Sequence, residues 1–177
     1  MGEKLIIGLS GWASSGKDEV AKILVKDFGY TKIALADPLR KALYTLNPFI
    51  RDNNRLAEVV DYYGWDYAKQ IPEVRRLLQV FGSEIGRNMI SSDLWVEMAL
   101  NSVHISDKVV ISDIRFPNEF DEVKWMFGEV WRVNRPSIDP VNRHESETAL
   151  DDFEFDRVID NEGSLDDLYA AVLGAME

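Results

Sequence analysis

Residues 5–18 of the chain read LIIGLSGWASSGKD, and this stretch decides the fold. The apolar run within Lys4–Leu9 predicts a buried β-strand, and a glycine- and serine-rich turn, Ser10–Gly16, follows it directly. Beyond the turn, apolar residues recur at helical spacing up to Gly29, a residue type that often ends helices. The chain is therefore expected to open with a strand, a turn and a helix.

The turn has the G-x-x-x-x-G-K spacing of a Walker A loop, formed by Gly11, Gly16 and Lys17. In such a loop the backbone N–H groups and the helix N-terminus attract phosphate, and the lysine adds a positive charge. The competing interpretation is an ordinary strand-to-helix turn. We expect the loop to bind ATP through the residues Gly11, Ala13, Ser14, Ser15, Gly16, Lys17 and Asp18.

Asp18 stands where the Walker A pattern has Ser or Thr. Its carboxylate either binds Mg²⁺, which prefers oxygen ligands, or only stabilises the first turn of the helix. A second carboxylate, Asp113, ends another apolar strand, and in a parallel sheet it can approach the phosphate loop from a neighbouring strand. Asp18 and Asp113 are thus the candidate metal ligands.

Arg115 follows Asp113 by two residues, so both side chains can project the same way from an extended chain. Phosphoryl transfer requires neutralisation of negative charge, and arginine can bind phosphate with two parallel hydrogen bonds. A salt-bridged strand end is the alternative for this pair, and we expect Arg132 to be structural. The residues predicted to act in catalysis are Lys17, Arg87, Asp113, Arg115 and Arg135.

Strands alternate with helices along the rest of the chain. Further strands are expected at Tyr30–Leu35, Lys108–Ser112, Glu129–Val133 and Arg157–Ile159. Helices are expected from an Asp37 N-cap with Pro38 at the first helical position, over Pro72–Arg87, from Ser92 to about Val103, from Pro117 through Phe127, and over Leu165–Met176. This alternation predicts one α/β domain over residues 1–177, a P-loop NTPase-type three-layer sandwich with a central parallel sheet, helices on both faces and a small lid.

The helix expected over Pro72–Arg87 carries one apolar stripe, and its other faces are unusual. Gly82 and Gly86 lie on a polar face beside Gln79, at a helix-propensity cost of about 1 kcal/mol each. We interpret these two glycines as positions where a ligand approaches the helix backbone.

The composition excludes several classes of protein. The chain has 177 residues, no cysteine, two histidines and a formal net charge of −11, which argue against disulfides, a thiolate or all-histidine metal site, and a nucleic-acid-binding surface. No apolar run is long enough for a membrane span, and no signal peptide is recognisable, so we expect a cytoplasmic protein without a membrane partner.

With these residues in hand, the chain resembles the phage-type deoxynucleoside monophosphate kinases, a branch of the P-loop nucleotide kinases. The matching segments are Gly11–Asp18, Ala36–Leu39, Leu78–Arg87, Asp93–Val96, Ser112–Glu119, His144–Glu147 and Asn161–Leu165. The aspartate after the loop lysine is shared with that family, whereas Glu19 departs from the family's usual threonine.

The resemblance implies transfer of the γ-phosphoryl group of ATP to a deoxynucleoside monophosphate, in the host cytoplasm if the chain is phage-encoded. It implies a helical acceptor-binding segment at about 37–104, a lid at about 135–152, and the loop near Asn161 beside the adenine. Of Arg75 and Arg76 only one should face the ligand. The residues expected to bind the acceptor are Asp37, Arg40, Arg76, Gln79, Arg87, Trp95 and Asp113.

Two other functions use the same loop. A different small-molecule P-loop kinase, of the dephospho-coenzyme A or phosphomevalonate type, needs the same arginines. A non-catalytic ATP-binding switch does not need so many arginines, and the sequence has no Asn-Lys-x-Asp guanine-reading motif. The expected partners are small-molecule nucleotides, and the sequence leaves open both the accepted base and whether the chain forms a homodimer.

Overall fold

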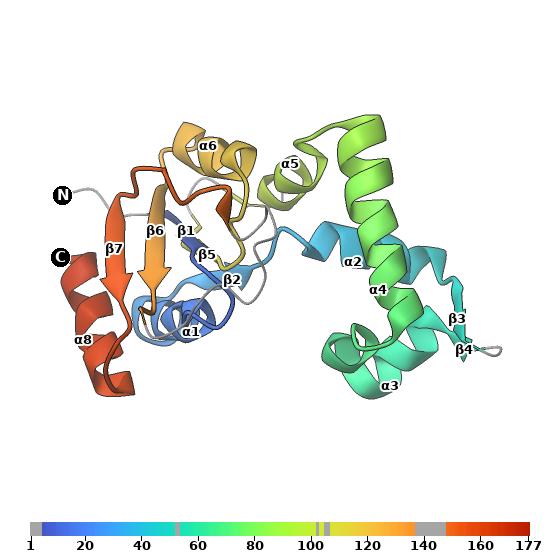
Figure 1. Cartoon of the computed structure of the whole chain (residues 1–177), viewed down its shortest axis with the longest axis horizontal. Helices are drawn as coiled ribbons and strands as arrows, with labels where there is room; N and C mark the ends of the chain where they lie inside the picture. The colour runs from blue at the N-terminus through green and yellow to red at the C-terminus, as the bar shows by residue number, and fades with distance from the viewer. Residues whose placement is uncertain (1–4, 52–53, 102, 105–106, 137–147) are drawn as a thin grey trace. The chain divides into compact units, whose positions relative to one another are not determined.

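A computed structural model describes residues 5–51, 54–101, 103–104, 107–136 and 148–177 (Figure 1). Its contacts divide the chain into two compact units. Unit 1 combines Met1–Ala34 with Ser102–Glu177, and unit 2 is the segment Leu35–Asn101 between them in sequence. Residues 137–147, which make up most of the segment predicted as the lid and include the matching segment His144–Glu147, lie outside the described residues.

Unit 1 is built on a parallel sheet. Among the described residues its five strands are β1 (Ile6–Ser10), β2 (Thr31–Ile33), β5 (Val109–Ile111), β6 (Glu129–Asn134) and β7 (Arg157–Asp160). They lie in the order β2-β5-β1-β6-β7, and all four neighbouring pairs are parallel. β1 is the central strand, with Gly8 opposite Ile111 of β5 and Val130 of β6.

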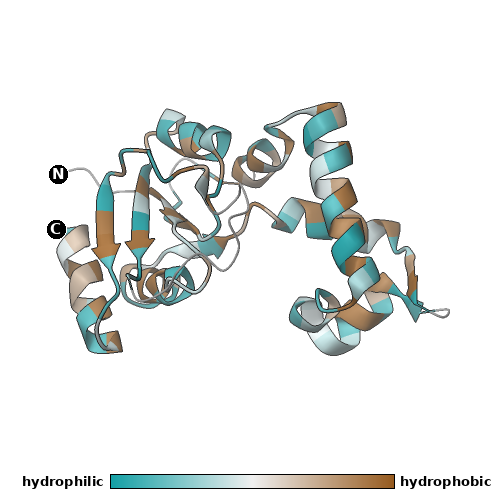
Figure 2. Ribbon diagram, in the orientation of Figure 1, coloured by the Kyte–Doolittle hydropathy of each residue, from teal (hydrophilic) through white to brown (hydrophobic). Residues whose placement is uncertain are grey.

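Helices cover both faces of this sheet. Figure 1 shows α6 (Pro117–Trp125) on one face, with α1 (Lys17–Phe28) and α8 (Leu165–Met176) on the other. One side of the sheet packs into a fully buried core with α1 and α8, and Figure 2 shows the apolar stretches of its strands in brown. The predicted fold class, a parallel sheet between two helical layers, is confirmed.

The strand order decides where a ligand can bind. α1 follows β1 and leads toward the β2 edge, whereas α6 leads from β5 over β1 to β6, on the opposite face. The crevice at the carboxyl ends of the strands beside such a reversal is the usual ligand site of α/β sheets. The loops that begin after Ser10, Ile111, Asn134 and Asp160 all start at this edge.

Unit 2 is mainly helical. Its elements are α2 (Asp37–Leu46), β3 (Phe49–Arg51), β4 (Asn54–Arg55), α3 (Leu56–Ala68), α4 (Pro72–Gln79), the π-helix η1 (Val80–Ile90) and α5 (Leu94–Leu100). β3 and β4 pair as an antiparallel hairpin, which the sequence did not predict. Leu43, Leu56 and Val74 are fully buried in a core of its own. Whether this unit binds the acceptor stays a prediction.

The helix expected over Pro72–Arg87 changes its geometry part-way. α4 ends at Gln79 and continues as a π-helix to Ile90, a form that is rare beyond single turns and frequent at functional sites. The interpretation of its two glycines is wrong, because side chains of unit 2 occupy the space beside them. A β-carbon on Gly82 would lie 3.1 Å from Leu39, and one on Gly86 would lie 2.5 Å from the Trp95 indole nitrogen.

Helix ends account for two further corrections. The N-cap of α2 is Ala36, not Asp37, because the Asp37 carboxylate pairs with Arg40 instead of capping the backbone. α6 ends at Trp125, and Phe127 has a positive φ of 59° and is 98% exposed, so it does not continue the buried stripe. Among the described residues, no helix combines the length and apolar character that a membrane span requires.

Gly86→Ala is expected to destabilise the protein by about 1–3 kcal/mol, because the added methyl group meets the Trp95 ring in a packed site. Gly174→Ala in α8 is the matched control, since nothing lies within 4 Å of its β-carbon position, and it should be neutral or stabilise by about 0.5–1 kcal/mol. Urea unfolding measures both. Equal stability of the two variants would contradict the packing of Trp95 on η1.

Candidate phosphate-binding site

The loop between β1 and α1 needs glycine at both ends. Gly11 and Gly16 have φ values of 144° and 109°, where other residues are strained. A β-carbon on Gly11 would collide with the Val133 carbonyl oxygen, and one on Gly16 would collide with the Asn161 side chain. Backbone conformation and close packing therefore both exclude side chains at the two Walker A glycines.

Lys17 closes the loop on itself. Its Nζ donates hydrogen bonds to the carbonyl oxygens of Gly11 at 2.6 Å and Trp12 at 2.7 Å. Lys17 is also the first residue of α1, so the ammonium group lies at the helix end where the dipole attracts anions. The loop thus presents one cation and a helix N-terminus together.

Ser15 is the most informative side chain in the loop. The residue is 2% exposed, and its hydroxyl has no hydrogen-bond partner within the described part of the chain. Because buried polar groups are almost always hydrogen-bonded, such a hydroxyl requires an explanation, and a ligand is one. A pocket of about 220 Å³ adjoins it, lined by Trp12, Ala13, Ser15, Val133, Asn134, Arg135 and Pro136.

Asn161 ties the loop to the far edge of the sheet. It follows β7, and its backbone N–H donates to the Asn134 carbonyl oxygen at the end of β6. Its side-chain Nδ2 donates to the Ser15 carbonyl oxygen at 2.9 Å. Asn161 therefore lies beside the phosphate loop, and its predicted contact with ATP stays a prediction.

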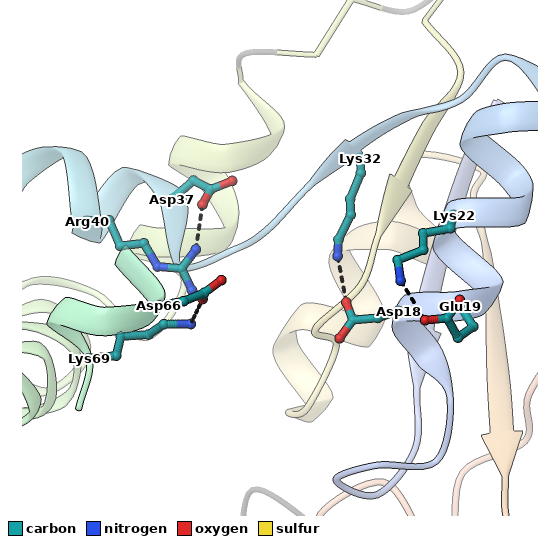
Figure 3. Close-up of polar contacts among 8 residues, drawn as sticks. All are labelled: Asp18, Glu19, Lys22, Lys32, Asp37, Arg40, Asp66 and Lys69. Atoms are coloured by element: carbon teal, nitrogen blue, oxygen red, sulfur yellow. Dashed lines mark hydrogen bonds and ion pairs between the residues drawn. The ribbon is translucent and has the colours of Figure 1, made fainter. Parts of the chain in front are cut away.

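Asp18 is paired with a lysine that the sequence did not single out. Lys32 Nζ from β2 lies 2.6 Å from Asp18 Oδ1 (Figure 3). This hydrogen bond, followed by the nearby positive charges, holds the pKa of Asp18 below its ordinary value, although partial burial opposes the shift. Glu19, the residue that departs from the family pattern, pairs with Lys22 at 2.6 Å.

A metal ion would have few protein ligands here. Within the described ranges, no group of three or more His, Cys, Asp or Glu residues could hold one. Mg²⁺ in kinases usually binds one or two carboxylates together with substrate phosphates and water, so Asp18 and Asp113 remain suitable candidates.

Asp113 and Arg115 follow β5, next to the phosphate loop in the sheet order. Asp113 is half-buried and Arg115 is exposed. The backbone N–H of Arg115 donates to Glu119 Oε2 at 2.7 Å, and this glutamate is 3% exposed. Sequence reasoning missed Glu119 as an individual residue, although its place three residues after the Phe116 N-cap is the spacing of a helix-capping carboxylate.

The two arginines at the end of β6 differ. Arg132 is buried, donates to Asp151 Oδ1 at 2.6 Å and lies over the rings of Trp12 and Phe155, so its predicted structural role is confirmed. Arg135 is exposed and lines the 220 Å³ pocket.

The predicted acceptor residues other than Asp113 belong to unit 2, and most already have partners. Arg40 pairs with Asp37 at 2.9 Å (Figure 3), and Trp95 Nε1 donates to the Gly82 carbonyl oxygen. Arg76 forms two hydrogen bonds with Glu73, which raise the pKa of the arginine and lower that of the glutamate. Gln79 ends α4 and is exposed, whereas Arg87 lies half-buried on the π-helix.

One pocket of unit 2 does not involve these residues. It measures about 450 Å³ and is lined by Ile50, Arg51, Tyr67, Gln70, Ile71, Pro72 and Glu73. The structure therefore brings Arg40 and Asp37 together, and Trp95 with η1, whereas this pocket is lined by other residues of unit 2.

Comparison with known protein families shows which family the chain belongs to. The family model described as deoxynucleotide monophosphate kinase matches residues 65–172, more than half of the chain. The chain belongs to the deoxynucleotide monophosphate kinase family. This membership confirms the predicted family and the predicted activity, that of a nucleoside monophosphate kinase, and it gives no support to the dephospho-coenzyme A kinase, phosphomevalonate kinase or switch alternatives.

Two viral relatives agree with this family. A protein of Acanthamoeba polyphaga mimivirus, proposed to be a deoxynucleotide monophosphate kinase, is 27% identical over 98% of this chain and 96% of its own. The deoxynucleotide monophosphate kinase of Escherichia phage RB69 is 32% identical, over 56% of this chain and 43% of the phage enzyme. A shikimate kinase structure from Aquifex aeolicus covers 97% of this chain and 95% of its own, with 13% identity and a TM-score of 0.48.

Asn161→Ala in this kinase is expected to weaken ATP binding about 2- to 12-fold, the equivalent of one hydrogen bond, because the Ser15 carbonyl loses its partner and the loop loses its support. Titration with a fluorescent ATP analogue measures the affinity. Tyr44→Phe is the control, since it removes one hydrogen bond, to Asp61, in unit 2. Unchanged affinity in Asn161→Ala would show that the bond does not support the loop.

Lys32→Met is expected to raise the pKa of Asp18 toward the ordinary carboxyl value of roughly 3.9, because the lysine hydrogen bond is the chief cause of the shift. A lowered folded-state pKa stabilises the fold above the unfolded-state value and ceases to do so as the pH falls through the folded-state value. At neutral pH the free energy of unfolding of the wild type should therefore exceed that of Lys32→Met by less than about 1 kcal/mol, since the pair is so exposed. In strong acid the two proteins should be equally stable.

Carboxyl-carbon NMR follows the pKa of Asp18, and urea unfolding at several pH values follows the stability. Lys22→Met is the control, because Lys22 is a minor contributor to the shift at Asp18. An Asp18 pKa that does not move in Lys32→Met would contradict the pairing.

Proposed function

We propose that the chain transfers the γ-phosphoryl group of ATP to a deoxynucleoside monophosphate, with the phosphate loop holding ATP and with unit 2 and Asp113 binding the acceptor. Family membership carries the choice of acceptor, since the relatives are named for deoxynucleotide monophosphates. The loop supports the choice of donor, because it combines two obligatory glycines, a cation, a helix N-terminus and a buried hydroxyl without a partner.

In this proposal each part of the loop has a distinct contact with ATP. Lys17 binds the β- and γ-phosphates, exchanging its bonds to the loop carbonyls for phosphate oxygens. The Ser15 hydroxyl donates to a phosphate oxygen and thereby gains the partner it lacks. Asn161 holds the loop from the end of β7, and Arg135 closes the pocket beside Trp12.

Magnesium fits the residues present. Asp18 in the first turn of α1 and Asp113 after β5 would supply carboxylate oxygens, which suit a hard cation. The ion would neutralise part of the charge on the ATP phosphates. For Asp18 to take part, its bond to Lys32 must be exchanged, because Lys32 now occupies one of its oxygens.

The chemistry needs no general base. A phosphate oxygen of the deoxynucleoside monophosphate already carries a negative charge, so it attacks the γ-phosphorus directly. The new bond joins that oxygen to the γ-phosphorus, the bond to the β–γ bridging oxygen breaks, and ADP leaves with the electron pair. The products are ADP and a deoxynucleoside diphosphate, and the protein contributes positioning and charge neutralisation.

Arginines supply that neutralisation. Arg115 and Arg87 are proposed to meet the transferring phosphoryl group, and Arg40 with Asp37 is proposed to border the acceptor phosphate. Arg40 already carries a carboxylate partner at 2.9 Å, so acceptor phosphate would compete with Asp37 for it. Arg76, Gln79 and Trp95 complete the proposed acceptor contacts. We place this reaction in the cytoplasm, in keeping with phage and viral relatives.

ADP release from ATP and Mg²⁺, measured with each deoxy- and ribonucleoside monophosphate and with dephospho-coenzyme A, tests the function. One or more deoxynucleoside monophosphates should accelerate it, and Lys17→Met should lower kcat/KM by roughly 10²- to 10³-fold because a charge-stabilising contact is lost. Acceleration by dephospho-coenzyme A alone would identify a different kinase. ATP binding without transfer to any acceptor would leave a binding protein.

A further inference from the structure

Glu119 is a buried carboxylate for which the reaction as described has no use. It is the third residue of α6 and only 3% exposed. Its Oε2 accepts hydrogen bonds from two consecutive backbone N–H groups, of Arg115 at 2.7 Å and of Phe116 at 3.1 Å. Burying a carboxylate is costly unless its oxygens are hydrogen-bonded, so these two bonds fix the turn before α6 strongly.

The same turn is held from the other side by β1. The backbone N–H of Ile114 donates to the Leu9 carbonyl oxygen at 3.2 Å, and the Ile114 side chain is 1% exposed. Ile114 also packs where Gly8 has no side chain, since a β-carbon there would lie 2.9 Å from it. Three successive N–H groups, of Ile114, Arg115 and Phe116, therefore all have partners in unit 1.

These contacts connect Arg115 with the strand that carries the phosphate loop. Leu9 lies two residues before Gly11, so the carbonyl that holds Ile114 belongs to the same strand end as the loop. Arg115 itself is exposed, and its side chain extends from a backbone that β1 and Glu119 hold on both sides.

We propose that Glu119 is a positioning residue for phosphoryl transfer: by binding the N–H groups of Arg115 and Phe116, it holds Arg115 at the distance from the phosphate loop that charge neutralisation requires. This inference rests on the proposed function, in which Arg115 meets the transferring phosphoryl group. A misplacement of about 1 Å in such a group can lower the rate roughly 10²-fold.

The test is a double-mutant cycle on kcat, with Glu119→Met in the wild type and in Arg115→Ala. Methionine keeps the approximate size of glutamate but accepts neither N–H. Glu119→Met should lower kcat about 10- to 100-fold, with the KM for ATP within about twofold. In the Arg115→Ala background the same change should lower kcat less than about twofold, because no arginine is left to position.

Two variants complete the design. Glu119→Gln keeps one oxygen acceptor and should restore most of the rate. If the methionine variant does not fold, Glu119→Asp takes its place in the cycle, because its shorter carboxylate holds the two N–H groups less closely and should lower kcat by a smaller factor, again only where Arg115 is present. Glu122→Met, on the same helix but half-buried, is the control and should leave kcat within about twofold of wild type.

An equal loss of kcat in both backgrounds would overturn the proposal, and so would a wild-type kcat in Arg115→Ala. Failure of the proposed function is separable, because it appears as a wild-type protein that transfers phosphate to no deoxynucleoside monophosphate.

Discussion

The parallel pairing of β1 with β5 on one side and β6 on the other is the constraint on which the site depends. Parallel neighbours end at the same edge of a sheet, so the segments after β1, β5 and β6 begin side by side. Gly11 then packs on the Val133 carbonyl of β6, and Leu9 bonds to Ile114 beyond β5. A shift of β1 by one residue would break both contacts and exchange its buried faces.

Much of unit 1 could be predicted because short, continuous stretches of sequence decide its strands, helices and phosphate loop. The apolar run around Ile7 predicts a buried strand, and the glycine spacing that follows predicts the phosphate loop. Gly29 ends α1 with a φ of 74°, as its residue type suggests, and α8 has the predicted bounds Leu165–Met176. In each case the residues that decide the structure lie within a few positions of one another.

The rest could not be predicted because distant residues decide it. Lys32 reaches Asp18 only because β2 and α1 are brought together, and Asn161 reaches Ser15 across 146 positions. The polar face of the helix after Pro72 looked like a ligand surface because the periodicity does not reveal that Trp95 folds back onto Gly86. The Trp95 indole N–H donates a hydrogen bond to the carbonyl oxygen of Gly82, which lies in the π-helix η1.

Unit 2 interrupts unit 1 between β2 and β5, two strands that pair directly. The unfolded chain must therefore close a long loop before this sheet can form, and the entropy of that closure grows only with the logarithm of loop length. Doubling the inserted segment would add about 0.6 kcal/mol. The sheet and its phosphate loop thus place almost no thermodynamic limit on the size of the segment between β2 and β5, and a larger or smaller unit could occupy that position on the same scaffold.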